Sequence, residues 1–376
     1  MKSQMIESVS EKAFSEFCQK LASDRNEQLA TAQNNRLPWP SKQLTRMADA
    51  GVYRWFVPVE QGGAGWSVHD LTLAYLKMSE ACLASTFVLT QRIAALKRVV
   101  VSTNNELVQR RLPLMVSGEA SATVGISHLT TSGQHLQRPV LIAESCDGGF
   151  VLNGFCPWVT GANDTKWLLV GACVDDGSAD PTVQFKRQIL ALVPIDAEGV
   201  SVDPGFDLIA LSETHTGRVR LVDVFVSECD CVAGPIENAL ASLSGAPSTG
   251  SYQSSALALG LSAAAIGYLS KQVERRPDLL AGTKALQANH EATVEILLQA
   301  TQGKSSCSNE QLRTEANSLV LRSTQAAMVA AKGAGFTCGH PVGRWCQEAM
   351  FFLVWSCPQA VQDANLCELA GVEFSL

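Results

Sequence analysis

The sequence of 376 residues has no excess of basic side chains, because 29 Lys and Arg face 36 Asp and Glu, a formal net charge of −7. Nucleic-acid-binding domains are typically basic, so the composition argues against a nucleic-acid partner. The chain also lacks an apolar run of about 18 residues, the length of a membrane-spanning helix. The longest run, Ala256–Leu269, is interrupted by glycine and serine, which favours a buried helix over membrane insertion.

Three further signals are missing. The first residues, MKSQMIESVSEKAF, contain no apolar core of a signal peptide, which predicts a cytoplasmic protein. The 12 Cys form no CxxC pair and no Cys/His ligand spacing, which indicates reduced thiols and no metal site. No GxGxxG or GxxxxGK(S/T) motif follows a strand-like run, which argues against a dinucleotide-type parallel sheet.

The hydrophobic pattern changes twice and divides the chain into residues 1–119, 120–236 and 237–376. Apolar residues three and four apart predict helices in the first block, with Asp70–Cys82 and Ser85–Val101 the longest. The middle block has short runs such as WLLVGACV and GRVRLVDVFV between Gly, Asp and Pro, typical of antiparallel strands. The last block is Ala-rich with a helical period. We therefore expect an α+β protein of three parts around a shared site.

Four segments carry a family resemblance: VPVEQGGAGWS (57–67), RRLPLMVSGEASATVGIS (110–127), GFVLNGFCPWVTGAND (149–164) and RVRLVDVFVSECDCV (218–232). In this order and spacing they resemble segments of the acyl-CoA dehydrogenase family of flavoproteins. The resemblance implies an N-terminal helical domain, a middle antiparallel β-domain and a C-terminal four-helix bundle. It also implies FAD as the cofactor.

Trp158 and Thr160 are two residues apart and would share one face of a strand. The resemblance implies that the Trp158 indole packs on the flavin ring and that Thr160 hydrogen-bonds near its N5 atom. A flat, partly apolar cofactor needs an aromatic wall and a few placed polar groups. The alternative is an ordinary core tryptophan and strand threonine.

The resemblance implies further cofactor contacts. Two hydroxyls, Ser127 at the flavin pyrimidine end and Ser132 near the pyrophosphate, would lie in the loop after the first strand. His128 in that loop is expected to be exposed, with a position facing the substrate mouth as the alternative. Four residues would reach the cofactor of a neighbouring subunit, which predicts a homodimer or homotetramer; they are Arg275 (or Arg276), Gln287, Gly333 and Gly335. A solvated arginine and helix-end glycines are the alternatives.

The family's reaction uses a Glu carboxylate to remove an α-proton while flavin N5 takes a hydride. Its usual position corresponds to Ser356 and a second known position to Gly250, and neither is a carboxylate. Glu348 and Asp363 are the nearest carboxylates in sequence to Ser356. Three readings stay open: oxidation of an acyl thioester such as acyl-CoA, with a separate electron acceptor and an unassigned base; a flavin monooxygenase; and a non-catalytic family member.

Overall fold

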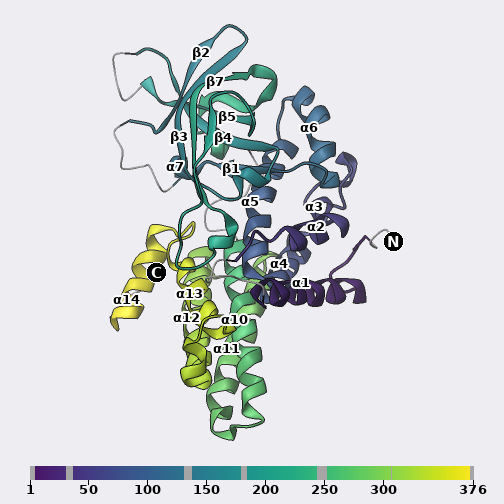
Figure 1. Ribbon diagram of the computed structural model, residues 1–376, viewed down its shortest axis with the longest axis vertical. Coiled ribbons are helices and arrows are strands. Elements are labelled where there is room, and N and C mark those ends of the chain that lie inside the picture. Colours follow the sequence, from purple (N-terminus) through teal and green to yellow (C-terminus); the bar gives the residue numbers. More distant parts are fainter. Residues whose placement is uncertain are drawn as a thin grey trace.

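The computed structural model describes residues 5–30, 37–130, 138–178, 184–243, 252–305 and 307–372. Figure 1 shows a β-sheet at one end of the molecule, N-terminal helices along one side, and long C-terminal helices extending away from the sheet. The predicted order of helices, strands and helices is confirmed.

Two of the N-terminal helices begin at a side chain that caps them. Ser67 accepts a hydrogen bond from the Asp70 backbone at the start of α4, and Asn104 accepts one from the Leu107 backbone at the start of α6. The elements are α1 (Lys12–Ala30), α2 (Ser41–Asp49), α3 (Val52–Trp55), η1 (Val59–Gln61), α4 (Val68–Ala81), α5 (Leu83–Val100) and α6 (Asn105–Ser117).

The middle part is one sheet of eight strands in the order β6-β7-β3-β2-β4-β5-β8, with β1 paired to β4. Most pairs are antiparallel as expected, but β2–β4 and β1–β4 are parallel. The chain reverses at the β2–β3 hairpin and again before β4, so β4 runs in the direction of β2 along its other edge. The elements are β1 (Ala122–Gly125), α7 (Ser127–Thr130), β2 (Leu141–Cys146), β3 (Gly149–Val159), η2 (Ala162–Asp164), β4 (Trp167–Asp175), β5 (Arg187–Pro194), β6 (Val200–Val202), η3 (Ser212–Thr214), β7 (Gly217–Ser227), η4 (Glu228–Asp230) and β8 (Cys231–Glu237).

The C-terminal part is built around α10, which contacts α4, α11 and α12. A Cβ on Gly260 would lie 2.4 Å from the Leu76 carbonyl oxygen, so glycine permits the close approach of α10 to α4. By length and composition α10 could cross a membrane, yet over half of its most apolar window (56%) is buried, as in the core helix of a soluble protein. The elements are α9 (Ala239–Ser242), α10 (Tyr252–Val273), η5 (Pro277–Leu279), α11 (Leu280–Ala300), α12 (Asn309–Ala331), η6 (Lys332–Phe336), α13 (Pro341–Met350), η7 (Phe351–Leu353) and α14 (Gln359–Ala370).

Candidate functional site

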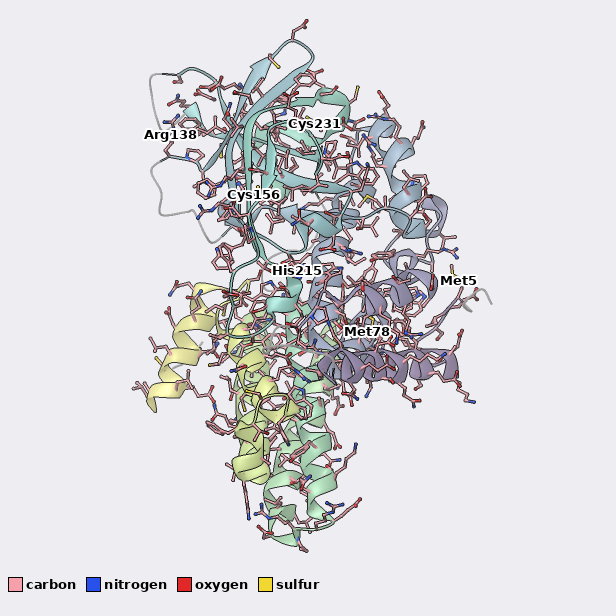
Figure 2. The ribbon with its side chains drawn as sticks, in the orientation of Figure 1. Met5, Met78, Arg138, Cys156, His215 and Cys231 are labelled. Atoms are coloured by element: carbon pink, nitrogen blue, oxygen red, sulfur yellow. The ribbon has the colours of Figure 1, made fainter. Side chains whose placement is uncertain are left out.

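The predicted ring-binding pair lies where β3 leaves the sheet, a region that Figure 2 shows between Cys156 and His215. The Trp158 side chain is 47% exposed, although tryptophan is usually well buried, and its ring lies edge-on to Phe206 with centroids 4.8 Å apart. Thr160 is 6% exposed. An accessible aromatic surface therefore stands beside a nearly buried hydroxyl.

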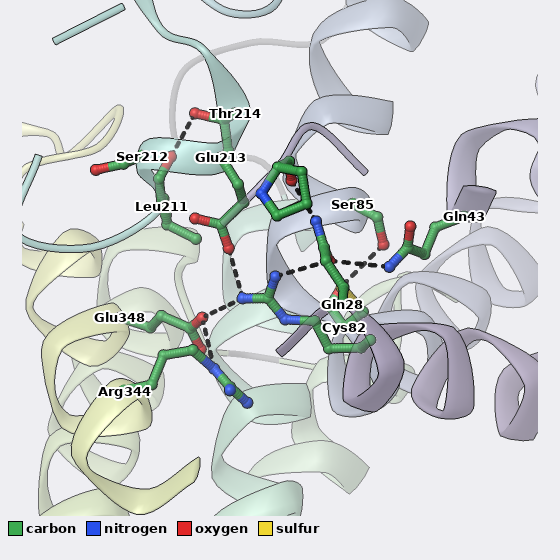
Figure 3. A network of polar contacts seen from close by, with 12 residues as sticks. Gln28, Gln43, Cys82, Ser85, Leu211, Ser212, Glu213, Thr214, Arg344 and Glu348 are labelled. Atoms are coloured by element: carbon green, nitrogen blue, oxygen red, sulfur yellow. Dashed lines mark hydrogen bonds and ion pairs between the residues drawn. The ribbon is translucent and has the colours of Figure 1, made fainter. Parts of the chain in front are cut away.

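Thr160 is the first of three linked hydroxyls, which we call the threonine chain (Thr160, Thr216 and Thr214). Its Oγ1 lies 2.9 Å from that of Thr216, which lies 2.8 Å from that of Thr214. Thr214 in turn donates to the Leu211 carbonyl at 2.7 Å, a bond drawn in Figure 3. The antiparallel β3–β7 register places Val159 opposite Gly217, and this brings Thr160, after β3, next to Thr216, before β7.

Sequence reasoning missed Thr214 and Thr216. The two threonines lie two residues apart just before β7, with Thr214 at the end of η3 and His215 in a left-handed conformation between them, so no strand pattern in the sequence pointed to their contact. The hydrogen bond between Thr216 and Thr160 joins residues 56 apart in the chain. It depends on the register of β3 and β7, which cannot be read from the local sequence.

The turn at Leu211–Thr214, where the threonine chain ends, is anchored by buried charged side chains. Glu213 in this turn pairs with Arg25 of α1 at 2.5 Å, and Arg25 also reaches Glu348 of α13 at 3.5 Å. Arg344 approaches the same Glu348 at 3.3 Å. Figure 3 shows these carboxylates and Arg344 meeting between three parts of the chain. The network fixes the turn, and with it the Leu211 carbonyl, against both helical parts.

The segment after β1 differs from the expected loop. Ser127–Thr130 form one helical turn, α7, that contacts β3. The Ser127 hydroxyl is buried and has no hydrogen-bond partner among the described residues, so it is available to a bound group. Ser132 lies outside the described residues.

The expectation of an exposed His128 is wrong, because its side chain is 6% exposed and its Nε2 donates to the Gly171 carbonyl at 2.7 Å. Gly171 makes room: a Cβ there would lie 2.4 Å from a Leu129 methyl carbon. Burial lowers the pKa of His128 despite this hydrogen bond, and its Nδ1 has no partner among the described residues. The ring is therefore held neutral.

The four residues expected to reach a neighbouring subunit lie in the C-terminal helical part of the chain. Arg275 is exposed just after α10, and Gln287 is exposed on α11, where it donates to Glu291 at 2.9 Å. Gly333 is exposed in η6, whereas Gly335 borders a cavity of about 510 Å³. The cavity lies between the turn before β7 and the start of α13. A cofactor contact by these four residues stays a prediction.

Ser356, at the expected position of the base, follows a packed aromatic cluster (Phe87, Phe351, Phe352 and Trp355). Trp355 stacks on Phe351 at 5.3 Å and meets Phe87 edge-on at 5.1 Å. Ser356 itself has a φ of +44°, a conformation that non-glycine residues rarely adopt. Three of the four rings, those of Phe351, Phe352 and Trp355, belong to the segment that directly precedes Ser356.

A buried arginine supports this turn. Arg313 of α12 is 1% exposed and donates to the carbonyls of Phe352 and Trp355, each at 3.2 Å. It makes no ion pair with a carboxylate among the described residues, and burial lowers its pKa to about 10. The nearest carboxylates in sequence to Ser356 are occupied: Glu348 in the Arg25 network and Asp363 by Gln359 at 2.8 Å. Gly250 lies outside the described residues.

Parts of the chain are similar to known proteins. Residues 8–119 match the family described as "Acyl-CoA dehydrogenase, N-terminal domain". Benzylmalonyl-CoA dehydrogenase of Aromatoleum aromaticum is 22% identical over 200 residues, 53% of this chain and 51% of that protein. The chain thus spans about half the length of the curated relatives it matches.

Solved structures match over nearly the whole chain. Glutaryl-coenzyme A dehydrogenase in its glutaryl-CoA complex has a TM-score of 0.78 at 15% identity, with 96% of each chain covered. The FMN-bound dibenzothiophene monooxygenase of Paenibacillus sp. A11-2 has a TM-score of 0.75 at 18% identity, with 96% of this chain and 97% of that chain covered. Residues 8–119 thus match the N-terminal domain of acyl-CoA dehydrogenases, and the chain as a whole has the fold of these proteins.

Proposed function

We propose that the protein is a flavin-dependent oxidoreductase that holds the ring of FAD against Trp158, with the Thr160 hydroxyl at the polar edge of the ring. The observation that carries the proposal is the half-exposed indole of Trp158 beside the buried threonine chain. The unpartnered Ser127 hydroxyl on α7 is a second polar group in reach of β3. These are the aromatic wall and the few polar groups that a flat cofactor requires.

The chain's own residues would bind and orient the cofactor. Trp158 supplies an apolar face, Thr160 a polar contact, and Ser127 a hydroxyl for the opposite edge of the ring. A bound flavin would accept a hydride or electrons from the substrate. FAD rather than FMN is proposed because it is the usual cofactor of the family. Gly333, Gly335, Gln287 and Arg275 would then contact the adenosine diphosphate half across a homodimer or homotetramer interface.

The proposed substrate is an acyl thioester, oxidised with flavin as the hydride acceptor. The names of the related dehydrogenases support this class. Trp355, directly before Ser356, packs against Phe87 and Phe351, and we expect these rings to narrow the space for a long acyl chain. Short or bulky acyl groups therefore fit best. A separate protein or small molecule would then accept the electrons from the reduced flavin. We also propose that the protein is cytoplasmic.

A flavin monooxygenase is the second candidate, and the residue at position 356 favours it. A serine without a neighbouring base does not abstract a weakly acidic α-proton, whereas oxygen chemistry on reduced flavin needs no such step. Both Glu348 and Asp363 already have partners. The monooxygenase of the same fold supports this candidate.

Anaerobic mixing with acyl-CoAs of different length, followed by the visible absorbance of the flavin, distinguishes the two. Slow bleaching by the wild type and faster bleaching by Ser356→Glu support acyl thioester oxidation with a missing base; Ser356→Gln is the matched control without a charge. General-base catalysis is typically worth about 10²–10⁴-fold. Oxygen consumption by reduced flavin that depends on an aromatic or sulfur substrate, with no bleaching in any variant, supports the monooxygenase. The oxidoreductase proposal fails if neither is seen.

A further inference from the structure

Arg313 of α12 carries a buried charge with unused hydrogen-bond donors. The residue is 1% exposed and makes no ion pair with a carboxylate among the described residues. Its Nη2 donates to the carbonyls of Phe352 and Trp355, but Nε and Nη1 are buried and have no hydrogen-bond partner in the described part of the chain. Buried polar groups in proteins are nearly always paired, so two unpaired donors on one buried cation indicate that Arg313 binds a further acceptor.

The acidic and thiol groups near Arg313 do not supply this acceptor. Glu368 lies on α14, which packs against α12 (Figure 1), and its carboxylate accepts a hydrogen bond from Ser318. Glu315, two residues along α12, is exposed. The thiol of Cys357 is close enough for its pKa to respond to the charge of Arg313, but burial raises this pKa overall, so the thiol stays protonated and neutral near pH 7. The described residues therefore leave the charge of Arg313 uncompensated.

An uncompensated charge in the protein interior is costly, because the interior solvates an ion much less well than water does. Burial accordingly lowers the pKa of Arg313 to about 10, a value at which the guanidinium is still charged at neutral pH. The rings of Phe352 and Trp355 lie 5.6 and 6.0 Å from the guanidinium carbon and offset part of the cost. The rings carry no net negative charge, so a bound anion would stabilise the folded chain further.

We propose that Arg313 binds a chloride ion through its unpaired N–H groups. A monatomic anion with one negative charge balances the guanidinium and accepts from N–H donors in any direction. A phosphate or sulfate would bring additional oxygens and charge that the described side chains do not satisfy. Arg313 also holds the turn before Ser356, whose φ of +44° is a strained conformation for serine. Bound chloride would therefore help to fix this turn, independently of the proposed function.

Urea unfolding of the full chain tests this site when chloride is replaced stepwise by gluconate, a much larger anion, at constant ionic strength. For the wild type, the folding equilibrium constant should rise with chloride, by up to about tenfold for each tenfold increase above the dissociation constant. Arg313→Met keeps much of the side-chain volume but removes the charge, and it should abolish this rise. Arg187→Met, which removes an exposed arginine on β5, is the matched control and should keep the wild-type rise.

Anomalous X-ray scattering gives a second measurement, which needs no variant and therefore holds even if Arg313→Met does not fold. Bromide can replace chloride and scatters anomalously, so wild-type crystals soaked in bromide should show an anomalous peak at hydrogen-bonding distance from Nε or Nη1 of Arg313. Equal stability of the wild type in chloride and gluconate overturns the proposal. So does a wild-type chloride dependence in Arg313→Met, or ordered water at the two nitrogens with no bromide peak.

Discussion

Replacing Arg25 by methionine tests the buried charge network that holds the site together. Arg25 is 3% exposed and pairs with Glu213 at 2.5 Å and Glu348 at 3.5 Å, both of which are 3% exposed. Methionine keeps much of the side-chain volume but removes the charge. Glu213 then loses the one ion pair that it makes among the described residues, while Glu348 keeps Arg344 at 3.3 Å.

Breaking a buried pair by removing one partner costs about 3–5 kcal/mol, because a buried charge is left uncompensated. For a chain of this size we expect the midpoint of thermal unfolding at pH 7 to fall by roughly 5–10 °C. Glu213→Gln on the Arg25→Met background should recover part of the loss, since the uncompensated carboxylate is removed as well. Glu27→Gln, which removes an exposed carboxylate that pairs with Lys42, is the control and should have little effect.

The stability loss of Arg25→Met should also depend on pH in a defined direction. Burial raises the pKa of Glu348, against the lowering by Arg344 and Arg25. Without Arg25 this pKa rises further, so the folded variant takes up a proton at a higher pH than its unfolded chain does. The stability deficit of Arg25→Met should therefore be largest near neutral pH and shrink as the pH falls. A deficit below about 1 kcal/mol, the worth of an exposed pair, or one that grows as the pH falls, would refute the reasoning.

Three further predictions concern single positions. Lys332 has φ +55° and ψ −146°, which glycine adopts readily. Lys332→Gly should therefore raise the free energy of unfolding by about 1 kcal/mol, seen as a higher unfolding midpoint; no change or a loss contradicts this. Because burial lowers the pKa of His128, wild-type stability should decline as the pH falls below about 6.5, and His128→Gln should flatten that decline; parallel pH profiles would count against it. Gly161 has φ +61° and a Cβ there would lie 2.2 Å from the Trp39 ring, so Gly161→Ala should cost about 2–3 kcal/mol, more than Gly177→Ala at φ +71° in open space; equal losses would contradict the packing argument.

Much of the fold could be predicted from the sequence because the spacing of its apolar residues is regular. The helices α4, α5, α10 and α12 coincide closely with runs of three- and four-residue spacing, and the strands with short apolar runs between turn residues. The exposed Trp158 and the neighbouring Thr160 could be proposed because they lie two residues apart on one strand.

The contacts that complete the site could not be predicted, because they join distant parts of the chain. Arg25 meets Glu213 across 188 residues and Glu348 across 323, and Thr160 meets Thr216 across 56. His128 is buried against the Gly171 carbonyl across 43 residues, and its neighbour Leu129 fills the space that Gly171 leaves on β4. Each of these follows from strand register and helix packing rather than from local pattern.

Titration of FAD and FMN into the purified protein, followed by flavin fluorescence, tests most directly whether the Trp158 surface holds a flavin ring. The wild type should bind with saturable quenching, Trp158→Leu should lose most of the quenching, and Thr160→Val should bind about fivefold more weakly, the worth of one hydrogen bond. Val222→Ala, at a side chain that is 60% exposed on β7, should match the wild type. No binding of either flavin by the wild type, or equal binding by all four proteins, would contradict the account.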